Sequence, residues 1–238
     1  MKQRGLKASL QKCCNWLLNE DNCVSAKLEI MAELKLVIFD CDGVMFDSKD
    51  ANRKYYNHLL EKFGYPLMDA QEEDYVHSHN VLASVAYIFR KYPHEINKVN
   101  AYRQSVDYTP FLKFMRIEPD LKEFLRFLKP QFYTAISTNR STTMDAVMKM
   151  HELDPYYDLV VTSLDVQQPK PHAEALLKIL SHFQLSAAEA VYIGDSMVDR
   201  EHTAAVNMRL ISFKNPELSA DFHVNSFLAI PRLPIFQE

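Results

Sequence analysis

The sequence predicts an α/β fold, in which helices cover both faces of a parallel sheet and a small helical unit is inserted after the first strand. Two patterns support this. After residue 33, short apolar runs alternate with longer segments whose apolar residues recur every three or four positions. The short runs are apolar on both faces, which suits strands buried between two layers of helices, so the sheet should be parallel.

Five apolar runs are expected to form strands of this sheet: residues 34–39, 132–137, 158–163, 190–194 and 209–213. Amphipathic helices are expected between them at 120–129, 142–153 and 172–183. In parallel sheets of this kind, ligands bind beyond the carboxyl ends of the strands. The residues that follow each strand are therefore the first place to look for a functional site.

The interval between the first two strands has a different character. It contains three helical segments and no convincing strand, so residues 49–109 are expected to form a helical cap. Gly64 suits the end of the first of these helices, because glycine readily adopts the left-handed conformation of a helix cap. The α/β core would then comprise residues 33–48 and 110–238, and residues 1–32 would form a separate extension, expected to be helical.

Composition excludes several classes of protein. The net charge of −4 over 238 residues argues against a basic surface for nucleic acid, so we expect no nucleic-acid partner. No uncharged apolar run of about 18 residues is present, so we expect no membrane partner. Four cysteines, all before residue 42, do not form a disulfide framework, which indicates a reducing, cytoplasmic location.

Polar and charged residues follow four of the predicted strands. They are Asp40 and Asp42, Thr138, Lys170, and Asp195 with Asp199. Because the carboxyl ends of parallel strands meet at one edge of a sheet, these side chains should converge. Carboxylates are the ligands that a hard divalent cation prefers. A lysine and a hydroxyl supply donors for a phosphate, and a carboxylate beside the metal can attack phosphorus.

Four short stretches here resemble the motifs of a known family, the haloacid dehalogenase superfamily of phosphotransferases. They are "DCDGV", "ISTN", "KP" and "GDSMVD", in the family's order. The resemblance covers about residues 33–230. "FDCDGVMFDS" is most similar to the branch of phosphoglycolate phosphatase and β-phosphoglucomutase. That likeness implies a Rossmann-like core with a helical cap inserted after the first strand.

The resemblance also implies a role for each motif residue. Asp40 would be the nucleophile that becomes an aspartyl-phosphate, and Asp42 the general acid–base. Dehalogenases lack an acid at the position of Asp42, so this chain looks like a phosphoryl-transfer enzyme. Mg²⁺ would bind through Asp40, the main-chain carbonyl of Asp42, and Asp195, with Asp199 supporting these ligands from behind. The groups that would hold the phosphoryl oxygens are Thr138, Asn139 and Lys170.

The resulting hypothesis is a magnesium-dependent phosphatase that acts on a small phosphorylated metabolite, with phosphoglycolate as the substrate that the resemblance implies. A sugar phosphomutase of the β-phosphoglucomutase kind is the main alternative, because it shares all these catalytic residues. A non-catalytic module that binds a phosphorylated ligand is a third, although none of the motif acids is missing. Two smaller expectations concern Asn207, which can adopt the left-handed conformation of a helix cap, and Cys41, expected to face the core.

Overall fold

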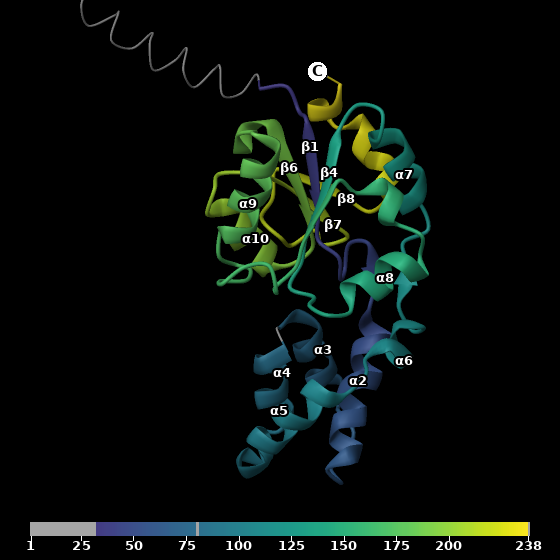
Figure 1. Cartoon of the computed structure of the whole chain (residues 1–238), viewed down its shortest axis with the longest axis vertical. Helices are drawn as coiled ribbons and strands as arrows, with labels where there is room; N and C mark the ends of the chain where they lie inside the picture. The colour runs from purple at the N-terminus through teal and green to yellow at the C-terminus, as the bar shows by residue number, and fades with distance from the viewer. Residues whose placement is uncertain (1–31, 80, 238) are drawn as a thin grey trace, which may run out of the picture.

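The structure is a computed structural model that describes residues 32–79 and 81–237. It consists of a sheet flanked by helices, with a helical cap beyond one edge of that sheet (Figure 1). The predicted extension, residues 1–32, lies outside the described residues except for Ala32. Within the described ranges, none of the helices is both long and apolar enough to cross a membrane.

The main sheet has the strand order β5-β4-β1-β6-β7-β8, and every neighbouring pair is parallel. Its strands are β1 (Leu36–Phe39), β4 (Tyr133–Ser137), β5 (Leu159–Val161), β6 (Ala190–Gly194), β7 (Arg209–Phe213) and β8 (Phe222–Val224). The five predicted strands are confirmed, and β8 adds a sixth that was not predicted. The chain runs outward from β1 in both directions, with β4 on one side and β6 on the other. Strand β1 is thus the switch point of the sheet, where ligands bind in such folds.

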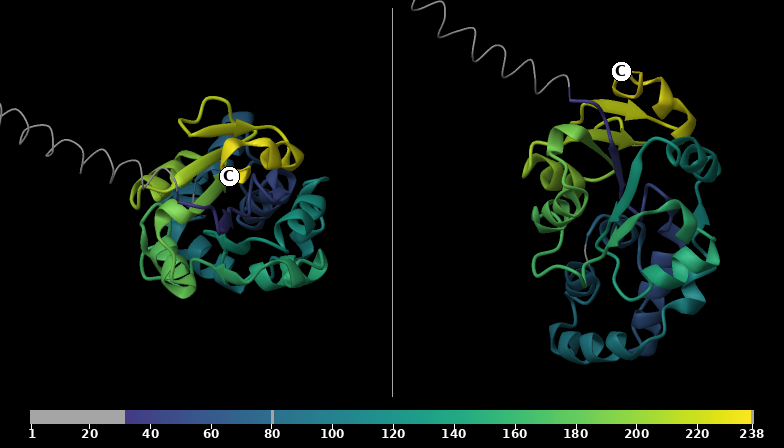
Figure 2. Two further views of the ribbon diagram at one scale, coloured as in Figure 1. Left: turned by 90° about the horizontal axis from the view of Figure 1, so that it is seen from above. Right: turned by 45° about the horizontal axis from the view of Figure 1, so that its top comes forward.

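The side chains of β1 alternate between two layers of helices. Val37 and Phe39 pack in the cluster that includes α7 (Leu121–Leu128) and α8 (Met144–Met150). Leu36 and Ile38 pack in the cluster that includes α9 (Glu174–Phe183). A strand sends successive side chains to opposite faces, so a run that is apolar throughout must be covered on both. Figure 2 shows the helices on either side of the sheet, with α10 (Met197–Ala204) beside α9.

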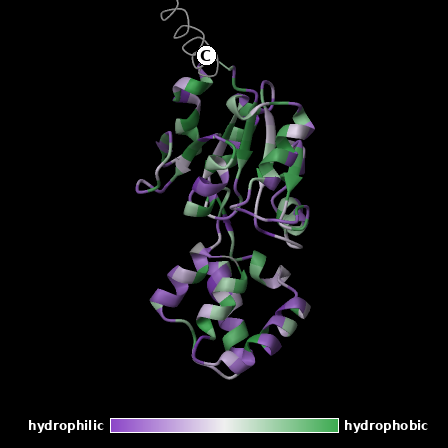
Figure 3. Cartoon of the chain, turned by 90° about the vertical axis from the view of Figure 1, so that its left-hand side faces the viewer, coloured by the Kyte–Doolittle hydropathy of each residue, from purple (hydrophilic) through white to green (hydrophobic). Residues whose placement is uncertain are grey.

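The helical cap is built from residues between β1 and β4. Its helices are α2 (Lys49–Lys62), α3 (Ala70–Ser78), α4 (Val81–Ile88), α5 (Ile96–Ser105) and α6 (Thr109–Leu112). They surround a hydrophobic cluster of their own, and in Figure 3 the apolar faces of these helices turn inward. The boundaries at 49 and 109 stay a prediction, and α6, which begins at the second boundary and runs to Leu112, packs against α2.

Two short strands join the cap to the core. Strands β2 (Phe46–Asp47) and β3 (Arg116–Ile117) pair antiparallel, so the chain enters and leaves the cap at adjacent points. The sequence did not predict them, because a strand of two residues is too short to show a period. Gly64 and Asn207 both adopt positive φ angles, of 76° and 55°, as expected for the caps of the helices that precede them.

Candidate active site

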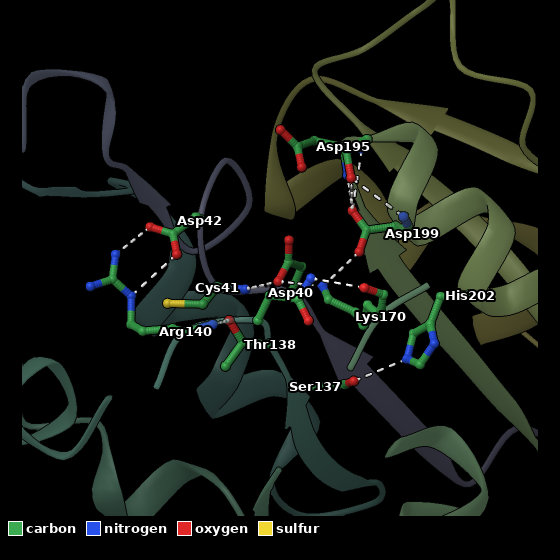
Figure 4. Close-up of polar contacts among 12 residues, drawn as sticks. Asp40, Cys41, Asp42, Ser137, Thr138, Arg140, Lys170, Asp195, Asp199 and His202 are labelled. Carbon is green, nitrogen blue, oxygen red and sulfur yellow. Dashed lines mark hydrogen bonds and ion pairs between the residues drawn. The ribbon is translucent and has the colours of Figure 1, made fainter. Parts of the chain in front are cut away.

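The predicted site residues meet at the carboxyl edge of the sheet. Asp40 directly follows β1, Thr138 follows β4, and Asp195 follows β6. Lys170 arrives from the loop after β5, and its side chain lies against that of Asp40 (Figure 4). The structure therefore brings together residues that are up to 155 positions apart, as the order of the strands requires.

Lys170 is the cation at the centre of this site. Its Nζ lies 2.8 Å from Asp40 Oδ1, 2.8 Å from Asp199 Oδ1 and 2.9 Å from the hydroxyl of Tyr192. Only 4% of its side chain is exposed. Burial lowers the pKa of Lys170, but the charges of Asp199 and Asp40 outweigh burial and hold that pKa well above its usual value. The lysine therefore carries its charge at pH 7.

Three carboxylates lie close together around this lysine, and their combined charge attracts a metal ion. Asp40, Asp195 and Asp199 each offer an oxygen, and these oxygens lie within 4.8 Å of one another. With one ammonium among them, the ionised cluster carries more negative than positive charge. Burial, and then the charge of Asp199, raise the pKa of Asp195 to about 7 and that of Asp40 well above its usual value. A divalent cation with oxygen ligands would offset this excess, so the donor set fits such an ion.

Gly43 gives Asp195 the room to join the cluster. Its φ angle is +83°, and a Cβ atom at this position would lie 2.0 Å from Asp195 Oδ2. The glycine of "DCDG" is therefore required both for the turn after β1 and for the close approach of the carboxylate.

Asp199 is fixed from several sides. It occupies the third position of α10, where it and Ser196 form a capping box. Its Oδ2 accepts hydrogen bonds from the backbone N–H groups of Asp195 and Ser196, both at 3.2 Å. Burial would raise the pKa of Asp199, but Lys170, and then the hydrogen bond that the Ser196 hydroxyl donates to Oδ2 at 2.7 Å, lower it below its usual value. The carboxylate is thus ionised, and both of its oxygens are already engaged.

Two of the three predicted phosphate-binding residues, Thr138 and Asn139, lie in the loop after β4. Thr138 is buried, and its Oγ1 accepts a hydrogen bond from the backbone N–H of Arg140 at 3.1 Å. The side-chain amide of Asn139 donates to the carbonyl oxygen of Lys170 at 3.1 Å, which ties this loop to the lysine. The structure thus shows a positioning contact for Asn139, and its contact with phosphate stays a prediction.

Asp42 lies apart from the other acids. Its carboxylate forms a two-pronged ion pair with Arg140, from Nη2 to Oδ1 and from Nε to Oδ2 at 3.2 Å. Figure 4 shows the carboxylate turned toward Arg140 and away from the other carboxylates. Burial would raise the pKa of Asp42, but the guanidinium lowers it below its usual value. The sequence interpretation overlooked Arg140, although its place directly after "STN" at a strand end was a usable signal.

A series of buried hydrogen bonds connects the elements that carry the site residues. The Nδ1–H of His202 donates to the carbonyl oxygen of His172 at 2.8 Å, and its Nε2 lies 3.1 Å from Ser137 Oγ. The carbonyl of Ser137 accepts a hydrogen bond from the hydroxyl of Tyr192 at 2.9 Å. These contacts link α10, β4 and β6 to the loop that carries Lys170. No pattern in the sequence indicated His202.

We expect His202 to make the protein sensitive to acid. Burial, and then the charge of Lys170, lower the pKa of His202 to about 4, whereas an unfolded histidine titrates near 6.5. The unfolded chain therefore binds the proton first as the pH falls below about 6.5, and about 3 kcal/mol of stability should be lost by pH 4. In His202→Gln, the melting temperature should fall less over this range.

The matched control for this prediction is His182→Gln, which changes an exposed histidine of α9. Thermal unfolding of the three proteins is compared between pH 7 and pH 4. If His202→Gln and the wild type lose stability equally, the buried histidine does not cause the loss.

The comparisons with known proteins agree with this geometry. A family model described as haloacid dehalogenase-like hydrolase matches residues 37–213. The crystal structure of a haloacid dehalogenase superfamily hydrolase of subfamily IA from Geobacter sulfurreducens is 33% identical, with a TM-score of 0.75, over 84% of this chain and 98% of that one.

Two further relatives are more distant. The pyrophosphatase PpaX of Bacillus cereus is 25% identical over 176 residues, which cover 70% of this chain and 76% of that protein. The structure of a predicted phosphoglycolate phosphatase from Haemophilus somnus is 19% identical, with a TM-score of 0.71, over 85% of this chain and 98% of that one, and shows the shared fold. With the family model matching most of its length, the chain belongs to the haloacid dehalogenase-like hydrolases.

Proposed function

We propose that the protein is a magnesium-dependent phosphatase, which hydrolyses a small phosphomonoester through an aspartyl-phosphate on Asp40. The observation that carries this proposal is the buried Lys170, whose ammonium lies 2.8 Å from Asp40 Oδ1 at the switch point of the sheet. A fixed cation beside a nucleophilic carboxylate suits the transfer of a phosphoryl group, because positioning and electrostatics dominate that reaction. Relatives named as pyrophosphatases support the same chemistry.

The reaction would take two steps. In the first, an oxygen of Asp40 forms a bond to phosphorus as the bond to the leaving oxygen breaks, and the leaving oxygen takes a proton from Asp42. Because Arg140 lowers the pKa of Asp42, Asp42 must first leave this ion pair and take up that proton from solvent. In the second, a water molecule attacks the phosphorus and gives a proton to Asp42, while Asp40 leaves as a carboxylate. Lys170 and Thr138 would hold the phosphoryl oxygens throughout.

The ligands of Mg²⁺ would be Asp40, Asp195 and the main-chain carbonyl of Asp42. The ion would supply positive charge that offsets the phosphoryl oxygens. The oxygens of Asp199 accept hydrogen bonds from Lys170, the Ser196 hydroxyl and backbone N–H groups, so Asp199 would keep Asp195 in place through the backbone rather than bind the ion.

We expect Gly43→Ala to disrupt this site. The added Cβ would meet Asp195 Oδ2 at 2.0 Å, so the carboxylate must move away from Asp40. A displacement of about 1 Å can cost a factor of 10² in rate, so phosphate release should fall at least ~10²-fold, with weaker binding of Mg²⁺ by calorimetry. The control is Gly64→Ala, where φ is +76° but nothing lies within 4 Å. That variant should be slightly less stable yet keep its activity, and equal losses in both variants would contradict the role of Gly43.

The proposed function is tested by a substrate panel with the purified protein. Phosphoglycolate, pyrophosphate, sugar phosphates, nucleotides and a phosphopeptide are compared in magnesium and in excess chelator. We expect small phosphomonoesters to release phosphate, chelation to abolish the reaction and Mg²⁺ to restore it. Full activity in chelator would overturn the metal assignment. Isomerisation of a sugar phosphate without release of phosphate would instead identify a mutase.

The proposed partner is accordingly a small phosphorylated metabolite. The proposed location is the cytoplasm, because the four cysteines of the sequence do not have the pattern of a disulfide framework.

A further inference from the structure

Arg140 has an unusual position for a charged residue. It lies in the loop after β4, and only 7% of its side chain is exposed. Two of its nitrogen atoms donate to the carboxylate of Asp42, and Nη1 donates to Thr143 Oγ1 at 3.0 Å. The ring of Tyr108, from the segment between α5 and α6, lies 5.7 Å from its Cζ.

A buried guanidinium needs an anion beside it. Arginine does not lose its proton in proteins, and removing one partner of a buried ion pair leaves an uncompensated charge. After Asp42, the strongest electrostatic neighbours of Arg140 are the thiol of Cys41 and the hydroxyl of Tyr108. The pKa of a free thiol is about 8.5 and that of a free phenol about 10, so neither group is an anion at pH 7. Asp42 is therefore the anion that offsets this charge in the described part of the chain.

The same carboxylate has another task in the proposed reaction. To exchange a proton with the leaving oxygen, Asp42 must come within about 2.6–3.2 Å of it. In the structure the carboxylate instead faces Arg140, and it is not among the three that converge beside Lys170 (Figure 4). One-third of the Asp42 side chain is exposed, so it can turn toward a substrate, whereas the buried Arg140 cannot follow. Each such turn leaves Arg140 without its counter-charge.

We propose that Arg140 determines substrate specificity. An anionic group on the part of the substrate that leaves takes the place of Asp42 on the guanidinium. Asp42 is then free to turn toward the leaving oxygen. This inference rests on the proposed function. It names the substrate class as phosphomonoesters or phosphoanhydrides whose leaving group carries a carboxylate or a phosphate close to the scissile bond. The planar guanidinium binds either oxyanion through two parallel hydrogen bonds.

Three esters of nearly equal size test the proposal. Phosphoglycolate has an anionic leaving group, ethyl phosphate a neutral one and phosphoethanolamine a cationic one, and pyrophosphate adds the phosphate case. For the wild type we expect kcat/KM to be at least ~10²-fold higher for phosphoglycolate than for ethyl phosphate, with phosphoethanolamine the poorest substrate, because buried charge pairs are worth factors of this size. Of phosphoglycolate and pyrophosphate, the substrate with the higher kcat/KM shows whether Arg140 prefers a carboxylate or a phosphate. Equal values for all three esters would overturn the proposal without any variant.

Two variants separate specificity from a structural role. In Arg140→Gln the ratio of kcat/KM for phosphoglycolate to ethyl phosphate should fall to within a few-fold of one. The rate with ethyl phosphate should hold or rise, because Asp42 is no longer held by Arg140. Arg140→Lys keeps the charge but loses the two-pronged contact, so part of the ratio should remain. Arg126→Gln, an exposed position on α7, is the control and should keep the wild-type ratio.

The outcomes also separate this proposal from the proposed function. If Arg140→Gln lowers the rates of all esters equally, Arg140 is only structural and the proposal is wrong. 4-Nitrophenyl phosphate, whose leaving group needs little protonation, is included as a general phosphatase substrate. If neither it nor any ester is hydrolysed with Mg²⁺, the proposed function itself fails, whereas hydrolysis of all esters without preference contradicts the role of Arg140 alone.

Discussion

Replacing Asp40 by asparagine should reduce phosphate release at least ~10³-fold, which is the scale of losing a catalytic nucleophile. The amide has nearly the same shape, and its oxygen can still accept the hydrogen bond that Cys41 N–H gives to Oδ1 at 2.7 Å. It carries no charge with which to attack phosphorus or hold a metal ion. Steady-state phosphate release and the yield of acid-stable phosphoenzyme measure the effect.

The same substitution should not destabilise the protein. Burial and the charge of Asp199 raise the pKa of Asp40, so the ionised carboxylate is unfavourable where it stands. Removing that charge in the absence of metal should leave the melting temperature unchanged or raise it, as often happens when a functional charge is deleted. Asp154→Asn, at an exposed acid, is the control. A folded Asp40→Asn protein with near-normal turnover would show that Asp40 is not the nucleophile.

Replacing Lys170 by methionine should cost both activity and stability. Methionine fills a similar volume but leaves the carboxylate of Asp199, which is fully buried, without its cation. Breaking a buried ion pair typically costs about 3–5 kcal/mol, which lowers the melting temperature of a chain of this size by roughly 6–20 °C. Because the folded-state pKa of Lys170 is raised, its contribution is fully present at pH 7 and is lost only as the pH rises through that pKa.

A second lysine gives a matched comparison. Lys35 pairs with Glu189 Oε1 at 2.8 Å, but 46% of its side chain is exposed, and so is 22% of its partner's. An ion pair between side chains open to solvent contributes little to stability, so Lys35→Met should change the melting temperature only slightly. Thermal unfolding of both variants at pH 7 checks the contrast. Equal shifts would mean that burial does not set the strength of the Lys170 contacts.

Much of the fold could be predicted because apolar runs and strand ends are local features. The runs that became β1, β4 and β6 were visible in the sequence, and a parallel sheet then places Asp40, Thr138 and Asp195 at one edge. The acid cluster and its lysine follow from the same argument. The strands that were not predicted are short. Strand β8 has three residues and β2 and β3 have two each, so none of them shows a measurable alternation of apolar and polar residues.

The partners of individual side chains could not be predicted, because they depend on packing between distant segments. Arg140 meets Asp42 across 98 positions of sequence, and His202 meets Ser137 across 65. A strand-end argument indicates that Asp42 is near the site but not which way its carboxylate turns. That direction is set by Arg140, whose own place is fixed by Thr143 and Tyr108. From its charge alone, Arg140 would be expected on the surface in contact with solvent.

The pairing of β2 with β3 has a consequence for how such a protein can evolve. Phe46 lies opposite Ile117, and Asp47 lies opposite Arg116, so the inserted helices leave the core and return to it at a single point. These helices have a hydrophobic cluster of their own, and none of the strands of the main sheet belongs to it. A segment whose ends meet can be lengthened, shortened or exchanged without moving the elements on which it is mounted. Related proteins can therefore acquire new substrates by exchanging the helices that are inserted at this junction. The residues that perform the chemistry keep their positions, because the central strands hold them.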